Sequence, residues 1–356
     1  MLVTLLLIIH FFINQVQLLI DKKILYYILG LLLISFFLFY ATRITYTADY
    51  DMYSAFYNWN YEDTDVLFRN INSLYREKQW GFHAVFATHI VAITVLFSSF
   101  ILKFNHNLFY IFTVFIILIF IPYINQIRYY VAFPSFLLAA YYLIYNRKLV
   151  FFVLFAVLGF MSHSAVVVLY TFFLFYYFMP EKYYAAVLKA GAAILFVGSY
   201  LVSKTSLITY LEHFGGYLSA ENQSSILGGV FNILPTLALL LPLYIMDKNY
   251  KGNKKDLTYI FLKKVSFFTT ILIPASIFIQ IIGQRYVFPF LVVWIVFFLY
   301  LIKEKKFSLR IRYVIGSYFL IAIVLYLQYG LANIVFGKSF YIEEVTETIE
   351  SINNYR

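Results

Sequence analysis

Two arginines stand where few charges are expected, beside long apolar stretches of the chain. Arg128 is flanked by apolar runs at 108–124 and 129–145, and Arg285 stands at the end of another such run. A charge held against hydrocarbon is costly unless it faces a polar cavity or a partner. A guanidinium stays charged and forks onto phosphate oxygens, so both residues are candidate anion-binding groups. The alternative is an ordinary arginine that extends toward a membrane surface.

Each arginine has an amide nearby that extends the candidate anion site. Asn125 precedes Arg128 by three residues, so the two would share one face if they lay on a single helix. Gln284 is adjacent to Arg285. The expected diphosphate-binding set is therefore Asn125, Arg128, Gln284 and Arg285.

Acids and a histidine supply candidates for proton transfer. Asp49 and Asp51 form an Asp-Tyr-Asp motif, in which carboxylates can bind a divalent cation beside phosphate. One of them could instead serve as a general base, and the alternative is a pair of solvated loop charges. His163, between two serines, is a candidate acid–base group or phosphate donor, or else a hydrogen-bonded interfacial side chain. Glu212 is a weaker candidate base.

The composition places these residues in a membrane protein. Hydrophobic residues make up 63% of the 356 residues and charged residues 12%, whereas soluble domains have roughly 25% charged residues. We therefore expect an all-α polytopic fold with 10 to 12 transmembrane helices, and 12 is the preferred count. The apolar spans are 1–20, 24–41, 81–102, 108–124, 129–145, 149–161, 164–179, 184–202, 227–246, 258–282, 286–302 and 309–328.

The distribution of Lys and Arg sets the expected orientation. With Lys22 and Lys23 inside, most of the 27 basic residues fall on the cytoplasmic side. The two long outer loops are then 42–80 and 203–226, and every candidate site residue lies on the outer side. We expect one transmembrane domain, 1–330, and a short tail, 331–356. The net charge of +10 is thus a membrane-anchoring pattern rather than a nucleic-acid footprint.

Several chemistries are excluded or unsupported by the sequence. The chain has no Cys, which rules out disulfides and thiol nucleophiles. It has no GxxxxGK[ST] motif and no long inner loop for a nucleotide-binding domain. No cofactor or resident metal is expected.

The order of the short motifs resembles the EpsG-type, Wzy-like polymerases of bacterial exopolysaccharides, capsules and O-antigens. The resemblance covers roughly residues 40–290, and the sequence departs from the family pattern at Tyr129, where Gln is usual, and at Gln79, where Glu is expected. The matching segments are Ala48-Asp49-Tyr50-Asp51-Met52-Tyr53, Glu77-Lys78-Gln79-Trp80-Gly81-Phe82, Asn125-Gln126-Ile127-Arg128-Tyr129-Tyr130-Val131-Ala132, Met161-Ser162-His163-Ser164-Ala165 and Arg285-Tyr286.

This resemblance implies polymerisation of lipid-linked repeat units at the outer face of a bacterial cytoplasmic membrane. A glycan would pass from polyprenyl diphosphate to a sugar hydroxyl of another lipid-linked repeat. Arg128 and Arg285 would bind the diphosphate, His163 would assist at the leaving group, and Asp49 or Asp51 would be the base. The implied partners are polyprenyl-diphosphate-linked oligosaccharide, membrane lipid, and glycan-assembly proteins such as a chain-length regulator, with no nucleic acid.

Two other functions fit parts of the pattern. A metal-dependent lipid-linked glycosyltransferase would use Asp49 and Asp51 as metal ligands. A transporter or flippase would use Arg128 to bind the lipid diphosphate in transit. The absence of a clear inverted repeat, and polar groups gathered at one face rather than at the midplane, speak against transport.

Overall fold

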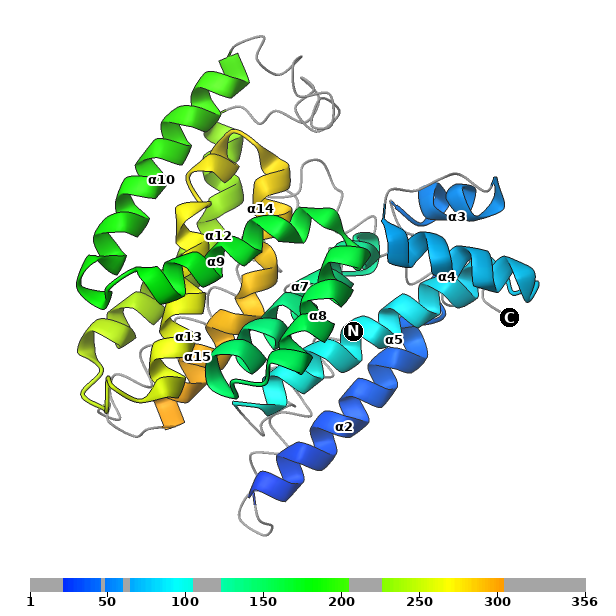
Figure 1. Cartoon of the computed structure of the whole chain (residues 1–356), viewed down its shortest axis with the longest axis horizontal. Helices are drawn as coiled ribbons and strands as arrows, with labels where there is room; N and C mark the ends of the chain where they lie inside the picture. The colour runs from blue at the N-terminus through cyan, green and yellow to red at the C-terminus, as the bar shows by residue number, and fades with distance from the viewer. Residues whose placement is uncertain (1–21, 46–48, 60–64, 105–122, 205–225, 304–356) are drawn as a thin grey trace. The chain divides into compact units, whose positions relative to one another are not determined.

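A computed structural model describes residues 22–45, 49–59, 65–104, 123–204 and 226–303, and it has no β-strand in these ranges (Figure 1). The prediction of an all-α membrane protein is confirmed. The helices group into two compact units, divided between Val166 and Val167. Each unit is described separately below.

Helix α7 (Ile127–Ala140) is the central helix of the first unit. It packs between α5 (Phe82–Leu102) and α8 (Leu149–Ser162), while α2 (Lys22–Ala41) packs against α5. Every residue of α7 except Arg128 is buried. A helix that is apolar all round buries all its faces. Its one charge is therefore an exception that needs a local explanation.

The predicted outer loop 42–80 contains two short helices, α3 (Tyr50–Asn58) and α4 (Val66–Glu77). Helix α3 buries Tyr50, Tyr53 and Tyr57, whose spacing places them on one face. It packs on α5, and α4 packs on both α5 and α8. These two helices hold side chains against α5 and α8.

The opposite end of α7 is aromatic and basic. The α-helix continues as a π-helical turn, η1 (Tyr141–Tyr145). The Lys103 ammonium lies 5.6 Å from the ring centres of both Tyr141 and Tyr142, and Tyr142 stacks on Phe155 at 5.6 Å. A cation over aromatic faces is favourable. Within this unit, the basic end and the Arg128 end are therefore at opposite ends of one helix.

The second unit is built from α9 (Val167–Phe178), α10 (Glu181–Lys204), α12 (Ile226–Asn249), α13 (Leu257–Phe268) and α15 (Leu291–Lys303). Helix α15 packs on α12 and α13.

Two polar contacts fix α13 within this unit. The Trp294 indole donates to the Ser266 carbonyl at 2.8 Å, and the buried Lys264 ammonium donates to the Tyr176 carbonyl in the last turn of α9 at 3.2 Å. A cation at a helix C-terminus compensates the unsatisfied carbonyls there. Lys264 therefore joins α13 to the end of α9.

The apolar span predicted at 258–282 is not one continuous helix. Helix α13 ends at Phe268 and is followed by η5 (Thr269–Ile271), η6 (Ala275–Ile277) and then α14 (Gln280–Tyr286). Pro274, which lacks an N–H, stands between the two 3₁₀ turns. Apolar periodicity does not report such breaks, so the sequence suggested a single span.

Four helices in the described ranges are long and apolar enough to cross a membrane, and three more are apolar but shorter. Many large apolar side chains are exposed, among them Val150 (80%) and Ile194 (70%), as expected where lipid is the solvent. The predicted total of 10 to 12 helices and the single domain 1–330 remain predictions. The long candidates are Phe82–Leu102, Ile127–Tyr145, Lys182–Val202 and Ile281–Ile302.

Candidate functional site

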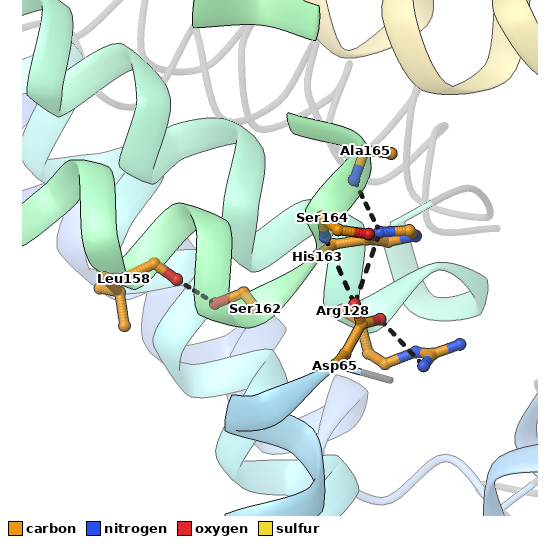
Figure 2. Close-up of polar contacts among 7 residues, drawn as sticks. All are labelled: Asp65, Arg128, Leu158, Ser162, His163, Ser164 and Ala165. Atoms are coloured by element: carbon orange, nitrogen blue, oxygen red, sulfur yellow. Dashed lines mark hydrogen bonds and ion pairs between the residues drawn. The ribbon is translucent and has the colours of Figure 1, made fainter. Parts of the chain in front are cut away.

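Asp65 connects three separate elements at one end of the first unit. It occupies the N-cap position of α4, yet its side chain makes no capping hydrogen bond to its own helix. Instead, one carboxylate oxygen pairs with Arg128 Nη1 at 2.9 Å and the other accepts from the Ser164 N–H at 3.3 Å (Figure 2). The carboxylate is almost fully buried, with 4% of the side chain exposed. Asp65 thus ties α4 to the start of α7 and to the segment that follows α8.

The Arg128 guanidinium is surrounded by aromatic rings as well as by this carboxylate. Its central carbon lies 4.9 Å from the Tyr53 ring centre and 5.3 Å from that of Phe68. The two rings are themselves 5.4 Å apart. Ring faces attract a cation, and Asp65 neutralises it. The cost of placing a charge on α7 is therefore offset by residues of α3 and α4, the two helices of the predicted outer loop.

His163 breaks the chain between two helices and faces Asp65. Its backbone is extended, so α8 stops at Ser162 and a 3₁₀ turn, η2 (Ser164–Val166), follows. The imidazole Nδ1 accepts from the Ala165 N–H at 3.3 Å and lies 3.8 Å from Asp65 (Figure 2). The second distance is too long for a hydrogen bond. The Ala165 contact makes Nδ1 an acceptor, which favours the tautomer with the proton on Nε2.

Tyr129, the residue that departs from the family pattern, packs edge-on against His163. The two rings are 5.6 Å apart at 83°, and Tyr129 is 1% exposed. Such T-shaped contacts are favourable. In this chain an aromatic ring therefore packs against the imidazole and holds it.

The Asp-Tyr-Asp motif lies at the start of α3, and its two acidic residues differ in exposure. Asp49 is half-buried and stands four residues before Tyr53, so the two share the helix face that meets Arg128. Asp51 is exposed. Residues two apart on a helix do not face one another. Of the two predicted acids, Asp49 has the burial and the helical spacing from Tyr53 that fit a role near Arg128.

Asn125 and Arg128 are not on one continuous helix, contrary to the expectation from their spacing. Gln126 has a non-helical backbone, and α7 begins only at Ile127. Asn125 is buried, with 7% of its surface exposed, and is the last helical residue before this break. The shared-face argument therefore fails, although Asn125 is still close in sequence to Arg128.

The other predicted site residues, Arg285, Gln284 and Glu212, are not in the described part of the first unit. Arg285 is in the short helix α14 of the second unit, so its pairing with Arg128 remains a prediction. Gln284 lies in the same helix. Glu212 falls outside the described residues. Within the described ranges, no three His, Asp or Glu side chains are grouped as metal ligands.

Asp65 is the functional candidate that sequence reasoning missed. The only local signal is that Asp65 stands immediately before the apolar residues Val66-Leu67-Phe68. An Asp in this position is typical of a helix N-cap. That pattern predicts a capping side chain. The contacts with Arg128 and Ser164 depend on the tertiary packing of α4 against α7 and α8, which no local pattern reports.

Comparison with known families identifies the family of this chain. The model of the EpsG family matches residues 26–342, most of the chain, so the protein belongs to the EpsG family. Membership indicates a polysaccharide-polymerase-like role, a form of glycosyl transfer, in a membrane protein. Searches of curated proteins and of solved structures gave no match.

Proposed function

We propose that this protein polymerises lipid-linked glycan repeat units by a Wzy-like reaction. The carrying observation is the buried cluster of Arg128, Asp65 and His163 at one end of an apolar helical unit. The donor is a glycan on polyprenyl diphosphate, and the acceptor is a sugar hydroxyl of a second lipid-linked repeat. Such a substrate needs a cation for its diphosphate, and the Arg128 guanidinium of this cluster can supply one.

In the proposed reaction, the acceptor oxygen attacks the anomeric carbon of the donor sugar. The bond from that carbon to the diphosphate oxygen breaks, and its electron pair stays on the departing polyprenyl diphosphate. The hydroxyl proton passes to a carboxylate base. Negative charge therefore grows on the leaving group, which is where a fixed cation lowers the barrier most.

Arg128 would bind the leaving diphosphate, and Asp65 would act as its positioning residue. The guanidinium is held by the carboxylate at 2.9 Å and by the rings of Tyr53 and Phe68, so its direction is set before substrate arrives. Pre-organised donors are worth more than mobile ones because they need no reorganisation during the reaction. Arg285, with Gln284, is proposed to supply a second cationic contact.

His163 is proposed to donate from Nε2 to the leaving diphosphate. This role follows from the tautomer that the Ala165 N–H contact at Nδ1 favours. Asp49 is the preferred base, because it shares the α3 face of Tyr53, whereas Asp51 is exposed. Glu212 remains a further candidate.

The proposed site lies at the outer face of the bacterial cytoplasmic membrane. The Arg128 end of α7 contacts the predicted outer segment 42–80, and Lys103 and Lys148 gather at the other end, as the positive-inside rule requires of the cytoplasmic side. The glycan-assembly partners expected from the sequence belong to this same proposal.

The decisive experiment compares Arg128→Ala with Arg128→Lys at normal expression, in cells that depend on this protein for polymer. We expect Arg128→Ala cells to accumulate single lipid-linked repeats and to lose long glycan. Lysine, a point charge without the planar fork, should restore only part of the activity. Long glycan that persists in Arg128→Ala cells would refute the proposal.

A further inference from the structure

The short connection between α4 and α5, residues 78–81, forms an exposed corner at the far end of α4 from Asp65. All four of its residues are exposed, and Trp80 has 52% of its surface exposed. Helix α4 has 12 residues, which at ~1.5 Å per residue places the corner about 18 Å along the helix from its Asp65 end. An oligosaccharide of a few sugars spans such a length.

The backbone of this corner is held firmly. The Trp80 N–H donates to the Tyr75 carbonyl at 2.8 Å and the Gln79 N–H to the Arg76 carbonyl at 2.9 Å. These two bonds form a Schellman motif, which normally has glycine where Gln79 stands. The Tyr57 hydroxyl of α3 also donates to the Trp80 carbonyl. The position of Trp80 is therefore set by both α3 and α4.

The indole ring of Trp80 is held by an aromatic contact, while 52% of the residue's surface is exposed. Tyr75 packs against it in a T-shaped contact at 5.0 Å, and the Tyr75 hydroxyl is 2.7 Å from Thr88 of α5. A rigid aromatic ring with an exposed face attracts the C–H groups of a sugar ring, because the π-face is electron-rich. Fixing the ring in advance reduces the entropy lost on binding.

Gln79 adds a polar group beside this ring at a conformational cost. Its φ of 56° is in the left-handed region, which favours glycine. A non-glycine residue in such a conformation is worth examining for a function. Its exposed amide can both donate to and accept from sugar hydroxyls.

We propose that Trp80 and Gln79 form a glycan-binding subsite for the sugar chain of a lipid-linked repeat. Trp80 stacks on the apolar face of a pyranose ring, and Gln79 hydrogen-bonds to its hydroxyls. The inference rests on the proposed polymerase function. It adds a second region that contacts the substrate, about 18 Å from the Asp65–Arg128 pair along α4. Its rival is a tryptophan that anchors the protein in the lipid interface.

Fluorescence of the full-length protein in vesicles tests the proposal directly. The probe is the oligosaccharide released by mild acid from the lipid-linked fraction of the producing cells. In a Trp59→Phe/Trp294→Phe variant, Trp80 is the sole indole, since the chain has three Trp. If that variant does not fold, the difference between wild type and Trp80→Phe gives the same signal.

We expect the oligosaccharide to cause a saturable change in Trp80 emission. In Gln79→Gly the affinity for the oligosaccharide should fall about tenfold, a loss typical of one good polar or aromatic contact. An interface anchor would instead be quenched by lipids brominated near the headgroup and would not respond to the sugar. Absence of a saturable, sugar-dependent change overturns the proposal, whether or not brominated lipid quenches.

Kinetics separate this subsite from the chemistry. Trp80→Ala should raise KM for the glycan substrate about tenfold and leave kcat nearly unchanged, because the residue lies away from the reacting atoms. Arg128→Ala should abolish polymer. The two proposals can therefore fail separately. Suppose that Arg128→Ala abolishes polymer, while Trp80→Ala has the KM and the sugar-dependent fluorescence of the wild-type protein. The subsite proposal is then wrong, and the polymerase proposal stands.

Discussion

The Asp65 carboxylate and the Arg128 guanidinium form a buried ion pair at 2.9 Å that fixes the outer segment to the central helix of the first unit. This contact changes how a loss of activity at Arg128 must be interpreted. Removing one member of a buried pair leaves the other uncompensated, which costs about 3–5 kcal/mol. Inactivity of Arg128→Ala alone would therefore mix misfolding with loss of a functional cation.

A charge-balanced double variant separates these two effects. Arg128→Ala should lower the unfolding temperature in detergent, and Asp65→Asn/Arg128→Ala should recover most of that loss because no buried charge is left unpaired. Polymer should stay absent in both variants. A double variant that regains long glycan would show that Arg128 has only a structural role.

The Asp-Tyr-Asp motif offers a second test, since its two members differ in environment. We expect Asp49→Asn to reduce polymer yield at least tenfold, because Asp49 shares the Tyr53 face that meets Arg128. Asp51→Asn, at an exposed position, is the matched control and should remain near wild type. Equal losses in the two variants would instead favour a joint role, such as the metal-binding alternative, which activity with and without a chelator would then examine.

Tyr129 provides a third test, directed at His163. Tyr129→Phe keeps the edge-on ring and should retain both stability and polymer length. Tyr129→Ala removes a fully buried ring and should destabilise the protein by about 3–5 kcal/mol, as for other buried aromatic truncations. Tyr129→Gln introduces the residue that the resemblance predicts here, and activity close to wild type would indicate that either side chain can position the imidazole. Thermal unfolding and glycan gels measure the two effects.

Positioning of Arg285 gives a fourth test in the second unit. The Thr269 hydroxyl donates to the Tyr286 carbonyl at 2.6 Å and so holds the end of α14. Thr269→Val should cost about 1–3 kcal/mol through the lost bond to a buried carbonyl, and should reduce polymer by displacing Arg285. Gly283→Ala should perturb α14 less, because a Cβ there meets the Ser276 Cβ at 3.3 Å, a contact that a small shift relieves, whereas at Gly198 it meets nothing within 4 Å. Gly198→Ala is thus the neutral control.

The sequence predicted the helical class and most helix positions, because long apolar runs can only be satisfied by helices in lipid. It also singled out Arg128 and His163, whose charge and chain-breaking position stand out against apolar neighbours. It could not reveal Asp65, whose partners at Arg128 and Ser164 are distant in sequence. The break at Gln126 lies in the polar interval between the predicted spans 108–124 and 129–145, so the sequence did indicate it. The interruption after Phe268 lies inside the predicted span 258–282 and was not predicted.

The conformation of Gln79 leads to the last prediction, which concerns stability. A left-handed φ costs a non-glycine residue about 1–2 kcal/mol, and part of this is offset in a glycine variant by the greater freedom of the unfolded chain. Gln79→Gly should therefore raise the free energy of unfolding by up to about 1 kcal/mol. Gln79→Ala loses the same amide but keeps the unfavourable φ, so it should show no such gain. Denaturation of both variants in detergent measures the difference, and equal stabilities would mean that the left-handed turn carries no strain. Gln79→Gly could prove more stable than wild type and yet bind the sugar chain less tightly. That result would show that Gln79 contributes to binding at a cost in stability, as expected of a functional residue.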